Sequence, residues 1–245
     1  MPVGQHIRES ACYAALLARR PLLWLLLAAL NLVPIANFIA LGYYARAASA
    51  GDLPPLRPLR RAFVLGVKIF AVLLAYGFII FFAAMYAYIA VILAAPQSMP
   101  LADRLLAAFA ALFGTAALLA LALGVPVALP AAARYGAAKA LNPAHSWRII
   151  RGAGLAEYLA FSAAAALLSV ADELLLYVAW ALAGLPGLVA TLIAVILAAP
   201  LIYLMLWKWA GLILEMAEQR IGTQDGPASG SVRAFKPAVV CGAAV

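Results

Sequence analysis

Three long stretches of this sequence carry no charged side chain, and they decide what the chain can fold into. Residues 69–96, 105–133 and 174–207 contain no Asp, Glu, Lys or Arg. A helix of about 20 apolar residues spans the hydrocarbon core of a bilayer, so each stretch is long enough to cross a membrane. Lipid cannot satisfy backbone polar groups, and alternating strand patterns are missing, so the spans should be α-helices. The sequence therefore predicts an all-α, polytopic transmembrane helical bundle.

The overall composition argues against a water-soluble globule. Of the 245 residues, 68% are hydrophobic and 11% are charged, and the mean hydropathy is +1.06. Soluble domains are about half apolar and about a quarter charged. A net charge of +8 would suggest nucleic acid in a soluble protein. In a membrane protein, however, basic side chains flank the spans and meet anionic headgroups, so we expect the lipid bilayer and no nucleic acid as the partner.

Turn residues and helix breakers divide the chain into segments. We expect an interfacial amphipathic helix at residues 1–20, a single transmembrane helical domain at 21–220, and a disordered cytoplasmic tail at 221–245. Within the domain, four long spanning helices follow a broken first membrane segment, and Pro126 and Pro130 should bend the end of the second long helix. The predicted segments are residues 21–44, 60–95, 102–139, 154–183 and 187–219.

The first membrane segment is predicted to break at Asn31, Pro34 and Asn37. Proline removes a helix hydrogen bond, and the flanking asparagine side chains can recap the two broken ends. The segment could cross the membrane once. Alternatively, it could be a re-entrant hairpin, since each half is too short to span but can be buried by other helices.

The distribution of Lys and Arg predicts the topology of the four long helices. In chain order, the counts are five in residues 45–68, one at Arg104, four in residues 134–151, none in residues 184–187 and four from Lys208 onward. This alternation follows the positive-inside rule and predicts a multi-pass cell-membrane protein with cytoplasmic basic linkers and C-terminus. If residues 21–44 cross once, thirteen basic residues lie inside and four outside, whereas a hairpin gives sixteen and one. We favour the hairpin.

A recognisable motif lies in the first third of the chain. Residues 32–46 read Leu-Val-Pro-Ile-Ala-Asn-Phe-Ile-Ala-Leu-Gly-Tyr-Tyr-Ala-Arg, followed by Gly-Asp-Leu-Pro at 51–54 and a glycine at position 66. This succession resembles the prokaryotic, largely archaeal membrane family called domain of unknown function 4013, over roughly residues 20–218. One departure is Pro-Leu-Arg-Pro at 55–58, where relatives usually carry acidic and aromatic residues. The resemblance implies a multi-pass helical membrane protein and no assigned activity.

A short internal similarity suggests a repeat. Residues 43–48 resemble residues 131–136 at a spacing of 88, and each stretch leads into a basic linker and then a long helix. Repeated helix pairs are common in transporters, which place their sites at repeat interfaces. In an alanine-rich chain such a similarity also arises by chance, so both explanations stay open.

The sequence contains no constellation that supports catalysis, a metal or a cofactor, so we expect no enzyme. His6 and His145 lack suitably spaced companions and should be solvated or lipid-facing. Asp172 and Glu173 form a weak candidate ion site, because ionisable residues in a span are costly and often functional. Counting along the helix from residue 154 puts them at roughly 27 Å, close to the outer boundary.

The basic residues of the linkers are the candidate contacts for anionic lipid headgroups or a partner protein. Lys68 and Lys208 should extend toward the cytoplasmic headgroups. The candidate contact residues are Arg46, Arg57, Arg60, Arg61, Arg134, Lys139, Arg148 and Arg151.

Two functions fit these features. The first is a non-enzymatic membrane subunit or scaffold, which forms a homo-oligomer or joins a membrane complex through its basic linkers. The alternative is a small-molecule or ion transporter that uses the discontinuous first helix together with Asp172 and Glu173.

Overall fold

The computed structural model describes residues 3–96, 99–122 and 124–224, and in these residues the chain is helical with no strand. The prediction of an all-α fold is therefore confirmed. Three helical stretches, Leu59–Ala94, Leu101–Tyr135 and Leu174–Ile221, are long and apolar enough to cross a membrane. The helices are α1 (Val3–Ala18), α2 (Pro21–Leu32), α3 (Asn37–Ala48), α4 (Leu59–Ala94), α5 (Leu101–Ala122), α6 (Val125–Tyr135), α7 (Ala137–Ala140), α8 (Pro143–Ala153) and α9 (Leu155–Gln224).

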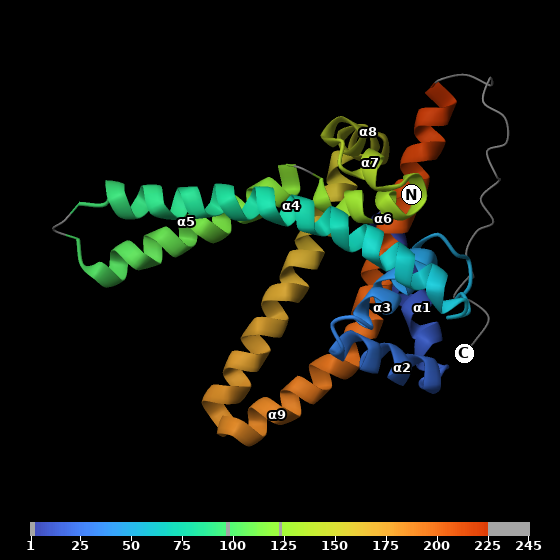
Figure 1. The fold of residues 1–245 in the computed structure, drawn as a ribbon, viewed down its shortest axis with the longest axis horizontal. Coiled ribbons are helices and arrows are strands. Elements are labelled where there is room, and N and C mark those ends of the chain that lie inside the picture. Colours follow the sequence, from blue (N-terminus) through green and yellow to red (C-terminus); the bar gives the residue numbers. More distant parts are fainter. Residues whose placement is uncertain (1–2, 97–98, 123, 225–245) are drawn as a thin grey trace.

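The last helix, α9, is a hairpin around which the rest of the chain packs. Gly184 has φ 60° and ψ −146°, a backbone conformation that glycine adopts readily and other residues avoid. This break lies in the turn predicted at residues 184–187 and divides α9 into a first arm before Gly184 and a second arm after it. The two arms diverge from the turn (Figure 1).

The amino-terminal helices lie along the second arm of α9, and their contacts trace the path of the chain. The contact pairs, in chain order, are Tyr13 with Lys208, Trp24 with Leu197, Tyr44 with Tyr203, and Ala48 with Gly211. The chain therefore runs from the level of residue 208 toward residue 197 and then returns to residue 211. A bend of 100° separates α1 from α2, and a second break follows at residues 33–36.

The asparagines beside Pro34 do not recap the broken helix as predicted. The residue at the N-cap of α3 is Ala36, and no side chain caps this end. Instead, Asn31 Nδ2 donates a hydrogen bond of 3.0 Å to the hydroxyl oxygen of Tyr44. Tyr44 is only 2% exposed, and a buried hydroxyl group needs a partner, so Asn31 ties α2 to α3 rather than capping either helix.

Helices α3 and α4 touch through their backbones. A Cβ atom on Gly42 would lie 1.8 Å from the carbonyl oxygen of Ala62, and one on Gly66 would lie 1.8 Å from that of Phe38. Each glycine thus faces the backbone of the opposite helix, in the small-residue packing that membrane helices use for close approach. This contact gives a physical reason for the glycines at positions 42 and 66.

The predicted helix at residues 102–139 is divided into α5, α6 and α7. Gly124 has φ 68° and Gly136 has φ 88°, so both lie in the left-handed region and interrupt the helix. Pro126 lies in the first turn of α6, where its missing N–H costs nothing, and therefore helps to begin a helix rather than bend one.

The second basic linker contains a helix that was not predicted. α8 begins at Pro143, and the Asn142 side chain caps it by accepting a hydrogen bond of 3.0 Å from the Ala144 N–H. At the other end of the chain, α9 continues to Gln224. The remaining part of the predicted tail, residues 225–245, lies outside the described residues.

The molecule consists of a packed part and two apolar hairpins that extend from it (Figure 1). We call the packed part the hub, which comprises residues 3–76, 125–162 and 204–221. One hairpin is formed by the end of α4 with α5, and the other by the two arms of α9. In the most apolar part of the three spanning stretches, only 22%, 7% and 11% of residues are buried, so most of their apolar surface is free to face lipid or other helices.

Candidate functional site

Buried polar side chains gather in the hub, around the second arm of α9. Burying a polar group is costly unless it is paired, so the partners of these side chains indicate what they do. The buried polar residues are His6, Ser10, Ser146, Glu157, Ser162 and Lys208.

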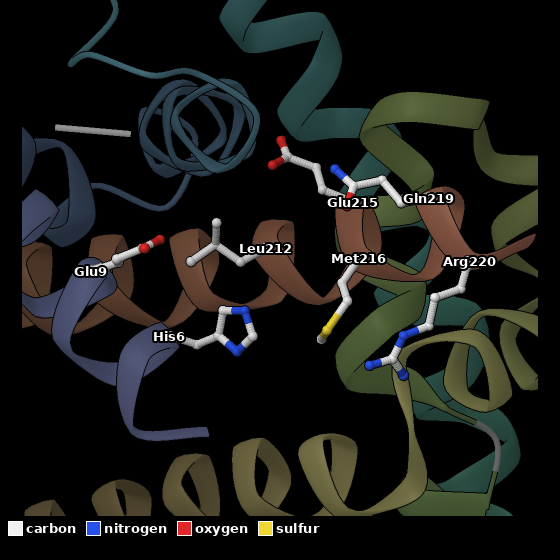
Figure 2. A pocket seen from close by; sticks show the side chains of 7 residues that line it. All are labelled: His6, Glu9, Leu212, Glu215, Met216, Gln219 and Arg220. Atoms are coloured by element: carbon white, nitrogen blue, oxygen red, sulfur yellow. The ribbon is translucent and has the colours of Figure 1, made fainter. Parts of the chain in front are cut away.

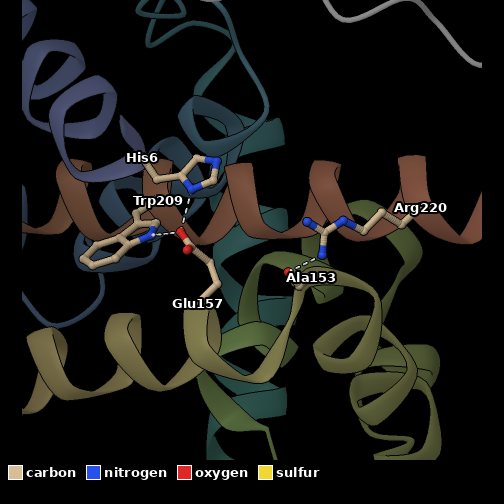
Figure 3. Close-up of polar contacts among 5 residues, drawn as sticks. All are labelled: His6, Ala153, Glu157, Trp209 and Arg220. Carbon is tan, nitrogen blue, oxygen red and sulfur yellow. Dashed lines mark hydrogen bonds and ion pairs between the residues drawn. The ribbon is translucent and has the colours of Figure 1, made fainter. Parts of the chain in front are cut away.

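His6 pairs with Glu157 in the centre of the hub. The Nδ1 atom of His6 lies 2.5 Å from Oε1 of Glu157, and the two residues are 3% and 6% exposed. The indole Nε1 of Trp209 donates a longer bond of 3.4 Å to the same oxygen (Figure 3). These contacts connect α1 to both arms of α9. The expectation of a solvated or lipid-facing His6 is therefore wrong, because the side chain is buried and paired. The sequence did not indicate this pair, since 151 residues separate His6 from Glu157.

Lys208 lies inside the hub instead of extending to the headgroups. Its side chain is buried, its Nζ donates a bond of 2.9 Å to the Ala50 carbonyl, and it lies 5.0 Å from the centre of the Tyr13 ring. The Tyr13 hydroxyl in turn donates to the Asp52 carbonyl at 2.9 Å. The first basic linker is thus attached to α1 and α9, whereas Lys68 is exposed as expected.

Replacing Lys208 by methionine is expected to lower the free energy of unfolding by about 2 kcal/mol, because a charged hydrogen bond and a contact with an aromatic ring are both lost. Lys68→Met is the matched control and should change stability by less than about 0.5 kcal/mol, since Lys68 is exposed. Thermal unfolding of both variants in one detergent measures the difference. Equal midpoints would show that the Lys208 contacts do not stabilise the hub.

The predicted basic contacts differ in their surroundings. Arg134 pairs with Glu218 through Nη2 and Oε2 at 2.7 Å and lies 4.0 Å from Glu215. Arg46 is half-buried, and its Nη1 is buried with no hydrogen-bond acceptor among the described residues. The exposed members of the set are Arg57, Arg60, Arg61, Arg134, Lys139, Arg148 and Arg151.

Two basic hollows contain Arg60, Arg61, Arg148 and Arg151 from this set. One, of about 950 Å³, lies between α8 and the end of α9 and is lined by Arg148, Arg151 and Arg220. The other, of about 470 Å³, lies at the start of α4 and is lined by Arg60, Arg61 and Lys68. The basic residues of the first linker and those of the second linker therefore form two separate basic surfaces.

A third hollow, of about 200 Å³, lies between α1 and the end of α9 (Figure 2). It is mixed in charge, because carboxyl groups from both helices line it together with a histidine and an arginine. Arg220 donates to the carbonyl of Ala153 at 3.0 Å (Figure 3). It also donates to that of Gly152 at 3.2 Å, and the two bonds cap the end of α8. The lining residues are His6, Glu9, Leu212, Glu215, Met216, Gln219 and Arg220.

His145 lies on α8, half-buried against Tyr135, with 5.2 Å between the ring centres. Burial lowers the pKa of the His145 imidazole, and the positive charges of Lys139 and Arg148 lower it further. This environment favours the neutral ring.

Among residues 3–96, 99–122 and 124–224, no three His, Cys, Asp or Glu side chains come close enough to share a metal ion.

The sequence reasoning missed the acidic partners of the hub. Glu215 and Glu218 are three residues apart, so they lie on one face of α9, and that spacing at the end of an apolar helix was a usable signal. Nothing local pointed to Glu157. The backbone of Asp172 and Glu173 belongs to the first arm of α9, but their side chains lie outside the described part of the structure.

The family model described as "Protein of unknown function (DUF4013)" matches residues 25–199. The matched range begins in α2 and ends in the second arm of α9, so it includes the break at residues 33–36, the glycine contact, the hairpin of α4 and α5, and the turn of the α9 hairpin. No curated protein and no solved structure matches the chain.

Proposed function

This chain belongs to the DUF4013 family of proteins of unknown function, and from its hub and hairpins we propose that it is a non-enzymatic membrane subunit or scaffold. One observation carries this proposal: the paired polar groups and the exposed apolar faces lie in different parts of the molecule. Paired polar groups hold the hub together, while the hairpins expose long apolar faces. A rigid base with separate membrane-embedded arms suits a protein that organises other helices.

The exposed face of α4 supports association with other membrane helices. Phe78, Phe81, Phe82 and Tyr86 are between 55% and 77% exposed and follow one another along the outer half of the helix. In lipid, helices associate by packing against each other rather than by excluding water. A second copy of this chain is the first partner to test, because most oligomers consist of identical subunits.

We further propose that the hub lies at the cytoplasmic face of the cell membrane and that α2 and α3 form a re-entrant hairpin. The path of the chain along α9 supports the hairpin. Between Tyr13 and Trp24 the chain moves along α9 from the level of residue 208 to the level of residue 197, a distance of 11 residues or about 16 Å of helix. By Ala48 it has returned to the level of residue 211. Both basic linkers and the amino terminus then share one side, in agreement with the positive-inside rule.

The test of the proposed function is the assembly state of the full chain in mild detergent and in lipid nanodiscs. Native mass spectrometry is expected to find a homo-oligomer or a complex of fixed stoichiometry. Replacing both Phe78 and Phe82 by alanine should reduce the assembled fraction, whereas Leu22→Ala, which removes an even more exposed apolar side chain from α2, should leave it unchanged. A strictly monomeric protein without a partner would contradict the proposal.

The transporter alternative rests on a different observation. α3 begins at Asn37 and α6 at Val125, so two helices that follow a break start 88 residues apart, as a repeat requires. Asp172 lies 12 residues before Gly184, roughly 18 Å below the turn. Substrate flux into vesicles that is lost in Asp172→Asn plus Glu173→Gln would favour transport over the scaffold. The absence of flux across a broad substrate panel would remove this alternative.

A further inference from the structure

A cavity of about 170 Å³, open to the surface at Ser49 and Arg134, lies in the hub between α3 and α6, with α4 and α9 as its other walls. One buried water needs about 10–15 Å³ of such space, so the cavity has room for a larger group. Its wall includes Arg46, Ser49, Leu65, Pro130, Arg134 and Gly211.

Arg46 brings to this cavity a positive charge that is not paired with a carboxyl group within 4.0 Å among the described residues. Its guanidinium cannot lose its proton in a protein, and its Nη1 is buried without an acceptor in the described part of the chain. Leaving a charged donor unpaired in such a place is costly. An oxygen anion in the cavity would supply the missing acceptor.

Arg134 reaches the same cavity from a position 88 residues later in the sequence. The carboxyl group of Glu218 pairs with it at 2.7 Å, and that of Glu215 lies 4.0 Å away. Arg134 is therefore held in place by its acidic partners and can orient an anion, while Arg46 provides a guanidinium that has no carboxyl partner among the described residues. The two arginines approach the cavity from α3 and from α6.

The cavity adjoins the basic hollow at the start of α4, because Leu65 lines both. Arg60, Arg61 and Lys68 line that hollow, and the exposed apolar side chains Val64 and Val67 lie beside it on α4. This arrangement attracts anions and offers a surface for an acyl chain next to the cavity.

We propose that the cavity between α3 and α6 binds a phosphate group, with Arg46 and Arg134 as its ligands. Arginine matches phosphate because its planar fork can donate two parallel, charge-assisted hydrogen bonds. The phosphate belongs either to an anionic phospholipid or to a soluble phosphate compound. This site goes beyond the proposed scaffold function and does not depend on the assembly state of the chain.

Two arms of one experiment test the site in the full chain, in nanodiscs of phosphatidylcholine. In the first arm, inorganic phosphate is titrated against chloride at equal ionic strength, and the midpoint of thermal unfolding is followed. In the second arm, the nanodiscs contain increasing fractions of phosphatidic acid. A ligand that binds the folded state raises the midpoint. A rise in both arms identifies the phosphate group itself, and a rise with phosphatidic acid alone identifies the lipid headgroup.

Matched variants decide whether binding in the cavity causes the rise of the unfolding midpoint. Arg46→Gln should weaken binding about tenfold or more, because a charged hydrogen-bond donor is lost. Arg8→Gln removes the same charge from an exposed position on α1, away from the cavity, and should bind as the unmodified chain does. If Arg46→Gln does not fold, Arg46→Lys keeps the charge without the fork and should still bind more weakly. No rise in either arm, equal losses in the Arg46→Gln and Arg8→Gln variants, or undiminished binding by Arg46→Lys would overturn the site.

Discussion

Replacing Gly66 by alanine is expected to lower the free energy of unfolding by about 3 kcal/mol, because the added methyl group meets a backbone oxygen that cannot move aside. The new Cβ would lie 1.8 Å from the carbonyl oxygen of Phe38, and the neighbouring carbonyl carbon and Cα are also within 3.0 Å. Only separation of α3 from α4 relieves this overlap. For a chain of this size, the midpoint of thermal unfolding should fall by about 10 °C.

The same helix provides the control. Gly77 also lies in α4, and a Cβ atom there would meet nothing within 4 Å. Gly77→Ala should leave the midpoint unchanged or raise it, because alanine favours a helix over glycine by about 1 kcal/mol. Gly42→Ala should behave like Gly66→Ala, since it has the same overlap with the Ala62 carbonyl. If all three variants unfold at the same temperature, α3 and α4 do not touch as described.

The hydrophobic pattern was sufficient to predict the helices that could cross a membrane, and the motif at residues 32–46 was sufficient for the family. Both signals are local, because a span is a property of consecutive side chains and their transfer into lipid. The same information predicted the break near Pro34, where α2 ends at Leu32 and α3 begins at Asn37.

Some local signals were present but were not used. Asn142 followed by Pro143 is the pattern of an N-cap and a first helical residue, and it marks the start of α8. Gly124 and Gly136, rather than the neighbouring prolines Pro126 and Pro130, interrupt the helix, because both glycines adopt positive φ.

Other features could not be predicted because they depend on which distant segments meet. The pairs His6 with Glu157 and Lys208 with the Ala50 carbonyl join residues 151 and 158 positions apart. When the distant partner is not known, a histidine or lysine near an apolar run is expected to be exposed, since exposure is the usual state of such a residue. Burial becomes acceptable only when the fold supplies the partner.

Removing one member of the His6–Glu157 pair is expected to cost about 3 kcal/mol, because the other member is left buried without its main partner. In His6→Leu, the contact that remains for the Glu157 carboxyl group among the described residues is the 3.4 Å bond from Trp209. In Glu157→Leu, the His6 ring loses the bond of 2.5 Å. Each single variant should also release α1 from α9, and limited proteolysis should then cleave α1 faster.

The double variant separates pairing from packing. His6→Leu with Glu157→Leu removes both members of the pair and fills the space with apolar side chains of similar size, at the cost of the long 3.4 Å contact that the Trp209 indole makes with Glu157. Replacing both members of a buried pair in this way is often nearly neutral, so the double variant should unfold within about 1 kcal/mol of the unmodified chain. Such recovery is the mark of two groups that act as a unit, whereas the losses of independent groups add. Additive losses in the thermal unfolding of the three variants would mean that His6 and Glu157 each stabilise the hub separately, and that their contact does not hold α1 in place.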